Sequence, residues 1–219
     1  MKDFLINQCI DSIYNANREI SKIDDKILEI EGMSTPKVRH LMNNICNFQD
    51  CNFLEVGTYM GSTLCSAAYK NNGFFMGIDN FSEFNTSIDE TSLHDKNKIK
   101  NSLYSNIEKT KQTNISFHEA DFFTSQVPIN SKINVFFYDG IHRYQSQYVN
   151  LKILKKSLDK YFIYLVDDYF CKVSEPKKAS VSAINDFGFE VVFYCELQPN
   201  EENKLNYHGG IGAFVLKNI

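Results

Sequence analysis

Four polar side chains of types suited to acid–base or metal chemistry follow two neighbouring apolar runs of the chain. Asp139 and His142 come after one run, and Asp167 and Asp168 come directly after the next. Crowded carboxylates repel one another, and a hard cation held by their oxygens keeps them ionised. A neutral imidazole near pH 7 can accept a hydroxyl proton. The residues predict a cation site on Asp139, Asp167 and Asp168, with His142 and Asp139 as catalytic residues; the alternative is a solvated acidic rim that caps helices.

A glycine-spaced turn is the second feature that could hold a ligand. The apolar run Asn52–Val56 leads into Gly57, and Gly61 and Ser62 follow where a helix is expected to begin. Gly57 permits a tight turn with close backbone approach, and amides at the start of a helix present positive partial charge to a polar group. The alternative is a turn that only lets the helix pack.

Two further acids point to an adenosine group. Asp79 ends the next apolar run about 20 residues after the glycine turn, where a carboxylate can accept both ribose hydroxyls. Asp121, followed by Phe122, ends the third run and could accept the exocyclic amine of adenine. Each acid could instead cap a helix or turn. Tyr59 stands where a dinucleotide fingerprint requires glycine, so a pyrophosphate is disfavoured.

Seven short apolar runs alternate with amphipathic stretches, which predicts an α/β fold with a doubly wound, seven-stranded, mostly parallel sheet. The runs are Asn52–Val56, Phe74–Ile78, Ile115–His118, Val135–Tyr138, Phe162–Val166, Val191–Tyr194 and Ala213–Leu216. Helical spacing between them involves Leu93, Ile99, Leu103 and Ile107, and then Tyr148, Leu151, Leu154 and Leu158. Residues 200–207 leave no room for a crossover helix, so the last strand should be antiparallel. Because parallel strands end at one edge, the polar residues should meet there.

Residues 1–47 are predicted to form a helical cap that belongs to the same domain as the core at 48–219. Its apolar positions at helical spacing are Phe4, Ile6, Ile10, Ile13, Ile23, Ile27 and Ile30. Ser34 or Thr35 is expected to cap a second helix that has Pro36 in its first turn. The apolar face of residues 4–13 is expected to pack on its own domain or on a second subunit, which leaves a homodimer as an open alternative. At Gly209-Gly210-Ile211-Gly212, a loose turn before the last strand is favoured over a close backbone crossing near the site.

The composition narrows the class of partner. Hydrophobic residues make up 43% and charged residues 23% of the 219 residues, as in soluble globular proteins. The net charge of -4 has no basic stripe for phosphate, so a small-molecule partner is expected and nucleic acid is not. The six cysteines have neither zinc-site spacing nor disulfide density, and no signal peptide or membrane span is visible. These observations predict reduced thiols and a cytoplasmic location, away from membranes.

Five motifs together resemble the class I S-adenosylmethionine-dependent methyltransferases, within the O-methyltransferase-like group of caffeoyl-CoA and macrocin types. The motifs are E-V-G-T-x-x-G-S-T at 55–63, G-I-D at 77–79, E-A-D at 119–121, D-G-x-H-x-Y at 139–144 and V-D-D-Y at 166–169. The resemblance, over roughly residues 32–219, implies that Glu55, Gly57 and Ser62 shape the methionine end of the cofactor pocket. It implies that Asp79 holds the ribose and that Asp121 lies at the adenine. The residues expected at the cofactor are Glu55, Gly57, Thr58, Gly61, Ser62, Asp79, Asn80, Asp121, Phe122 and Asp139.

The resemblance further implies a magnesium site on Asp139, Asp167 and Asp168. Ile141 stands where the macrocin type carries an aspartate, so His142 is assigned as the base from its position. The expected reaction is methyl transfer from S-adenosylmethionine to a hydroxyl oxygen of a small molecule. Three alternatives stay open: a metal-independent N- or C-methyltransferase whose acids bind a cationic substrate, a nicotinamide oxidoreductase, and a catalytically inactive adenosine-cofactor-binding protein.

Overall fold

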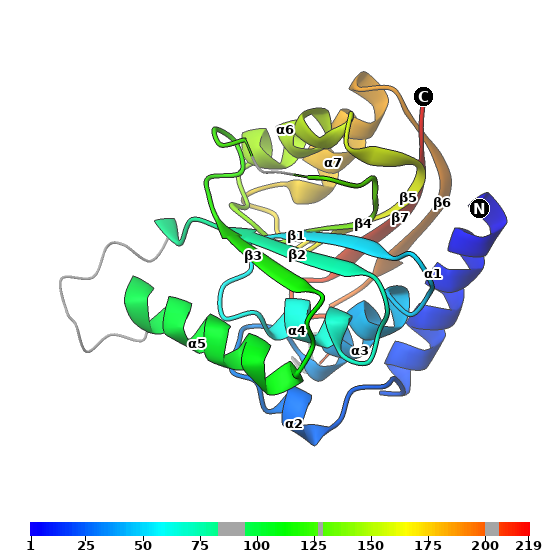
Figure 1. The fold of residues 1–219 in the computed structure, drawn as a ribbon. Coiled ribbons are helices and arrows are strands. Elements are labelled where there is room, and N and C mark those ends of the chain that lie inside the picture. The colour runs from blue at the N-terminus through cyan, green and yellow to red at the C-terminus, as the bar shows by residue number, and fades with distance from the viewer. Residues whose placement is uncertain (83–94, 127–128, 200–205) are drawn as a thin grey trace.

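A seven-stranded sheet forms the middle layer of the protein, with helices on both faces (Figure 1). The computed structural model describes residues 1–82, 95–126, 129–199 and 206–219. The strands are β1 (Asn52–Val56), β2 (Phe74–Asp79), β3 (Ile115–Glu119), β4 (Ile133–Tyr138), β5 (Leu158–Val166), β6 (Phe189–Leu197) and β7 (Ile211–Asn218). Their order is 3-2-1-4-5-7-6, and only the pairs that include β7 are antiparallel. The doubly wound sheet with an antiparallel last strand is therefore confirmed.

The helices divide between the two faces of the sheet. They are α1 (Lys2–Asn17), α2 (Asp25–Leu28), α3 (Pro36–Ile45), α4 (Ser62–Ala68), α5 (Lys96–Thr110), α6 (Tyr144–Leu154) and α7 (Pro176–Asp186). In Figure 1, α6 and α7 lie above the sheet and α3, α4 and α5 lie below it. Alternate strand residues supply the two cores: Phe53 and Phe137 pack with α1, α3 and α4, whereas Leu54 and Phe136 pack with α6 and α7. Among the described residues, no helix combines the length and apolarity that crossing a membrane requires.

The first helix belongs to the core of the sheet. Leu5, Cys9 and Ala16 of α1 are fully buried in the same cluster as the strand residues, and α1 packs against α3 and the edge formed by β5, β7 and β6. The predicted apolar face packs on its own domain only in part: Ile6 and Ile13 pack against the core, whereas Phe4 and Ile10 are each 47% exposed. The fully or almost fully buried side chains of α1 are those of Leu5, Cys9, Ser12 and Ala16.

The segment between α1 and α3 is less helical than its apolar spacing predicted. Of the stretch that carries Ile23, Ile27 and Ile30, only Asp25–Leu28 is helical. Side chains of α3 bind the preceding chain instead: the Lys22 amide donates to Asn43 Oδ1 at 3.0 Å. The second helix begins as expected, with Thr35 as its N-cap and Pro36 in its first turn.

The bounds of several elements differ from the sequence prediction. Leu158 continues the helical spacing of α6 but begins β5, where it pairs with Ile133 and stays buried in the same core. β5, β6 and β7 are longer than their apolar runs. β5 and β6 include charged residues at exposed positions, such as Lys160 and Glu190, whereas β7 begins earlier, at the buried Ile211. Leu93 lies outside the described residues. All six cysteines are free, and four of them are buried.

Replacing Leu5 with alanine should destabilise the whole domain, because its side chain is fully buried against the sheet. We expect the free energy of unfolding in urea to fall by about 2–5 kcal/mol. Ile10→Ala on the same helix is the matched control, and it should change this free energy by less than about 0.5 kcal/mol. Equal effects of the two variants would contradict the packing of α1 described above.

Candidate functional site

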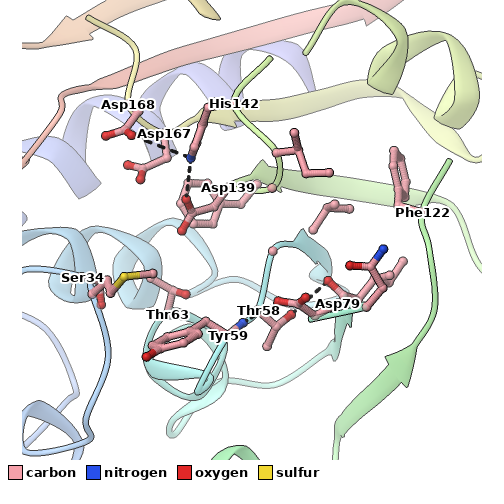
Figure 2. A pocket seen from close by; sticks show the side chains of 18 of the residues that line it. Ser34, Thr58, Tyr59, Thr63, Asp79, Phe122, Asp139, His142, Asp167 and Asp168 are labelled. Atoms are coloured by element: carbon pink, nitrogen blue, oxygen red, sulfur yellow. Dashed lines mark hydrogen bonds and ion pairs between the residues drawn. The ribbon is translucent and has the colours of Figure 1, made fainter. Parts of the chain in front are cut away.

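A cavity opens at the carboxyl ends of the central strands, where most of the predicted residues meet (Figure 2). The predicted residues that line it are Gly57, Thr58, Ser62, Asp79, Asn80, Asp121, Phe122, Asp139, His142, Asp167 and Asp168. Glu55 and Gly61 are not among its lining residues. The sheet topology brings these residues together, because they lie at or after the ends of five parallel strands, β1 to β5.

The ends of β1 and β4 touch at the floor of the cavity. Gly57 has a φ of +91°, and a Cβ there would overlap the carbonyl oxygen of Asp139. The Asp139 amide donates to the Val56 carbonyl at 2.8 Å, which extends the pairing of the strands into the loops. Glycine is therefore required at position 57 by both backbone conformation and space.

Asp79 shapes the glycine turn from the neighbouring strand. Its Oδ2 accepts the Tyr59 amide at 2.8 Å, and its Oδ1 accepts the Phe81 amide at 2.7 Å. Burial raises the pKa of this carboxyl group, while the backbone hydrogen bonds oppose the rise. Each carboxylate oxygen has a second acceptor site, so Asp79 can cap these turns and still accept hydrogen bonds from a ligand in the cavity.

Asp121 caps a turn and also lies at the cavity wall. Its Oδ1 accepts the Phe123 amide at 2.9 Å, and its backbone carbonyl accepts the Ser125 amide at 2.8 Å. The turn-capping alternative is therefore observed. Asp121 and Phe122 nevertheless line the cavity, so the cap holds a carboxyl group and an aromatic ring at its wall.

Glu55 lies fully buried beneath this cavity. Its Oε1 accepts the hydroxyl of Thr63, which does line the cavity, and its Oε2 has no hydrogen-bond partner among the described residues. Burial raises the pKa of Glu55 to about 8, against the opposing effect of the Thr63 hydrogen bond. The side chain is therefore mostly protonated at neutral pH.

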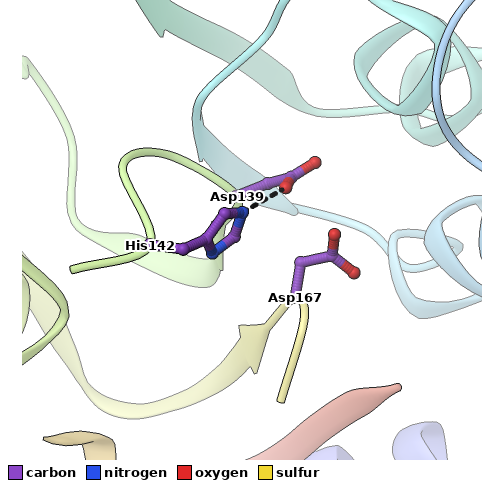
Figure 3. Close-up of side chains that lie close together, drawn as sticks. All are labelled: Asp139, His142 and Asp167. Atoms are coloured by element: carbon purple, nitrogen blue, oxygen red, sulfur yellow. Dashed lines mark ion pairs between the residues drawn. The ribbon is translucent and has the colours of Figure 1, made fainter. Parts of the chain in front are cut away.

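The acidic group and the histidine face one another across the ends of β4 and β5. His142 Nε2 lies 3.5 Å from Asp139 Oδ1 and 3.8 Å from Asp168 Oδ2. One possible ligand atom from each of Asp139, His142 and Asp167 lies within 4.8 Å of the others (Figure 3). Burial raises the pKa of both Asp139 and Asp167, and the charge of Asp139 raises that of Asp167 further. This metal-compatible group has His142 where the sequence predicted Asp168, which lies beside the imidazole instead.

Sequence reasoning missed the walls that come from outside the strand ends. Met33, Ser34 and Thr35 line the cavity from the segment before α3, although Ser34 and Thr35 were considered only as helix caps. His208 lines it from the chain before β7. The glycine-rich stretch beside His208 was the sequence signal that could have indicated this wall.

The chain before β7 makes a close crossing at the site, where a loose turn was favoured. The Phe170 amide donates to the Gly209 carbonyl at 3.1 Å, and the Tyr169 amide donates to the Gly210 carbonyl at 3.0 Å. These bonds continue the antiparallel pairing of β5 with β7 past the strand ends. They place His208 on the same side of the cavity as Asp168.

Comparison with solved structures reveals the same fold in methyltransferases. The O-methyltransferase TomG from Streptomyces achromogenes, in complex with SAM, has a TM-score of 0.62 and 12% identity, with 97% of each chain covered. The O-methyltransferase from Bacillus cereus, in complex with SAH, has a TM-score of 0.59 and 12% identity, with 98% of this chain and 100% of that chain covered. TrmN from Thermus thermophilus has a TM-score of 0.58 and 13% identity over 89% of this chain. The protein spans 52% of TrmN, about half its length.

The fold is thus the Rossmann-like fold of the class I S-adenosylmethionine-dependent methyltransferases. No family model matches the chain, and no curated protein matches it by sequence. At identities of 12–13%, the likeness to these structures establishes architecture alone. Any activity has to be argued from the cavity itself.

The buried carboxyl group of Glu55 should leave a signature in the pH dependence of stability. Its pKa is about 8 in the folded protein against an ordinary value of 4.5, so its contribution to stability is present below pH 4.5 and is lost as pH rises towards 8. Glu55→Gln keeps an acceptor for Thr63 but cannot ionise. As pH rises through this window, the free energy of unfolding of the variant should increase relative to that of the wild type by up to about 1.4 kcal/mol per pH unit. Urea unfolding at several pH values measures this difference. Parallel stability curves for the two proteins would refute a raised pKa.

Proposed function

We propose that the protein transfers a methyl group from S-adenosylmethionine to a small-molecule acceptor, with a hydroxyl oxygen as the methylated atom. One observation carries the proposal: acids suited to an adenosine and an acid–histidine group share one cavity at the carboxyl edge of a methyltransferase fold. The two groups lie on opposite sides of the contact between Gly57 and Asp139. This arrangement is suited to a cofactor on one side and an acceptor on the other.

The residues on the β1–β3 side suit an adenosine cofactor. Asp79 would hold the ribose hydroxyls, and Asp121 with Phe122 would lie at the adenine. The glycine turn with Ser62 would hold the methionine end. Glu55 Oε2, which is buried without a hydrogen-bond partner in the described part of the chain, supplies a further polar atom below that turn. Tyr59 fills the position that a pyrophosphate-binding turn leaves empty, so these features support an adenosine without a pyrophosphate.

The chemistry of the acceptor side follows from His142 and its neighbours. S-adenosylmethionine, when bound, supplies a sulfonium methyl group that a hydroxyl oxygen can attack. His142 would accept the hydroxyl proton at Nε2, and the carboxylates of Asp139 and Asp168 near that atom would stabilise the resulting imidazolium. The cavity walls would hold the acceptor in line, which contributes by proximity and orientation.

A divalent cation such as Mg²⁺ is a further part of the proposal. Asp139, Asp167 and His142 would hold it, and there it would acidify an acceptor hydroxyl. The imidazole atom near the carboxylates is Nε2, while Nδ1 is buried and has no hydrogen-bond partner among the residues that the structure describes. Because Nε2 cannot hold a cation and accept a proton at once, the metal-ligand and base roles of His142 are alternatives. With a cation present, another base is needed.

The charge of the lining residues bears on the acceptor. Five aspartates line the cavity, and no lysine or arginine of the described residues does. This favours a neutral or cationic acceptor over one that carries phosphate or carboxylate groups. It also favours the second candidate function, methylation of an amine that the acids bind directly without a metal. A chelator separates the two, because only the cation-assisted reaction should slow.

The cofactor is tested by calorimetric titration with S-adenosylhomocysteine and, in parallel, with NADH. We expect saturable binding of S-adenosylhomocysteine alone. Asp79→Asn should weaken it by roughly ten- to a hundredfold, because one charge-assisted acceptor is lost. Asp186→Asn, on the far side of the sheet at the end of α7, should have no effect. Binding of NADH instead would contradict the proposal and favour a nicotinamide oxidoreductase.

The cation site can be tested without knowing the acceptor. Mn²⁺ binding to the complex with S-adenosylhomocysteine can be followed by the loss of its free-ion EPR signal. Asp167→Asn should weaken this binding at least about tenfold, because a charged oxygen ligand is removed. Asp159→Asn at the opposite end of β5 is the control. If the wild type leaves Mn²⁺ free, the metal-independent reaction is favoured.

A further inference from the structure

A buried arginine holds the chain that walls the cavity before α3. Arg39 of α3 is 5% exposed, and its Nη1 donates to the carbonyls of Leu28 at 2.9 Å and Ile30 at 2.7 Å. A longer bond of 3.4 Å reaches the carbonyl of Ile27. One guanidinium thus gathers the carbonyls at the end of α2 and fixes the path of the segment that follows, Ile30–Thr35.

The charge of Arg39 is balanced in an unusual way. No carboxylate of the described residues forms an ion pair with it, and burial lowers its pKa. Backbone carbonyls and one hydroxyl supply all the acceptors that the structure gives it. Lysine could not reproduce this pattern, because the planar guanidinium presents five donors in a fixed fork.

Arg39 is also connected to the glycine turn after β1, through the hydroxyl group of Ser34. Arg39 Nε donates to Ser34 Oγ at 3.0 Å, and Ser34 Oγ lies 2.7 Å from Ser62 Oγ. Ser62 is the first residue of α4, directly after the glycine turn. Both serines line the cavity, and Figure 2 shows Ser34 there. A Cβ at Gly32 would overlap the Ser62 side chain, so the segment packs tightly against the turn.

The wall extends from this segment to the chain before β7. The Thr35 hydroxyl donates to the Asn206 carbonyl, while the same oxygen accepts the Val38 amide as the cap of α3. Tyr207 donates from its hydroxyl to Asn17 Oδ1 at 3.0 Å at the end of α1. The Ile30–Thr35 segment, which Arg39 fixes, therefore lies between the glycine turn and the chain that carries His208.

We propose that Arg39 is a positioning residue for the methionine end of the cofactor: it acts through Ser34 to hold the Ile30–Thr35 segment against Ser62. The inference rests on the proposed function. A wall held in place before binding lowers the ordering cost of binding, so loosening it weakens affinity even where the fold survives. Arg39 itself does not line the cavity, which separates its role from that of a binding residue.

The test compares Ser34→Ala and Arg39→Lys with Ser21→Ala by calorimetric titration with S-adenosylhomocysteine. Ser21 is the matched control. Its hydroxyl group lies 2.9 Å from Nδ1 of His40, which is on α3 beside Arg39, and neither Ser21 nor His40 lines the cavity. We expect Ser34→Ala and Arg39→Lys each to weaken binding by roughly three- to tenfold, which is the loss of one hydrogen bond, and Ser21→Ala to leave it unchanged. The melting temperature of each variant is measured alongside.

Hydrogen exchange of residues 27–35 gives a second readout. In the wild type, S-adenosylhomocysteine should slow exchange little, because the segment is already ordered; in Arg39→Lys it should slow exchange strongly. Equal affinities of the wild type, Ser34→Ala and Arg39→Lys would overturn the positioning role and leave the proposed function intact. An equal loss in Ser21→Ala would also overturn it, by showing a general effect of stability. A wild type that does not bind S-adenosylhomocysteine would overturn the proposed function and this inference with it.

Discussion

The backbone contact between Gly57 and Asp139 fixes the geometry of the cavity. β1 lies between β2 and β4, so the order of the strands reverses at this point, and the loops after β1 and β4 lead to opposite faces of the sheet. A larger residue at 57 would force the two loops apart, because its side chain would occupy the place of the Asp139 carbonyl. With glycine, the acid from β4 lies directly beside the turn after β1.

Crowding of acids is the electrostatic consequence of that geometry. The chain brings Asp79, Asp139 and Asp167 to one edge and buries Glu55 below them, and burial raises the pKa of all four. A free carboxylate in such a place is unfavourable, so protons, backbone amides or a positive ligand must compensate it. Backbone amides compensate the charge of Asp79, and a bound proton neutralises Glu55. Asp139 and Asp167 have His142 beside them, which makes this side the one that gains most from a cation or a protonated base.

The strand ends were predictable from the sequence because their signals are local. A buried apolar run followed by glycine or aspartate fixes where a strand stops, and parallel strands stop at one edge. Residues such as Gly57, Asp79 and Asp139 could therefore be assigned to one cavity from their places after the apolar runs. Leu158 could not be assigned correctly, because helix and strand would bury it in the same core.

The remaining walls depend on contacts between distant parts of the chain. Ser34 reaches the cavity only because Arg39 binds carbonyls of α2 and because Gly32 leaves room for Ser62. His208 reaches it because Gly209 and Gly210 pair with the chain after β5. No local pattern encodes such pairings. The burial of Arg39 could not be predicted from the sequence for the same reason, since arginine residues on helices are usually exposed.

The position of β7 between β5 and β6 constrains the order in which the protein can fold. β6 is an edge strand whose described ladder is made with β7 alone, so it has no place in the sheet until the later β7 has been synthesised and inserted. α1 packs against the same three strands, and Tyr207 binds Asn17 across 190 positions of sequence. Closing such distant contacts is slow, and it leaves apolar surface of both the first helix and the half-built sheet exposed on the ribosome. Insertion of β7 therefore completes this part of the sheet and at the same time provides the surface that buries α1.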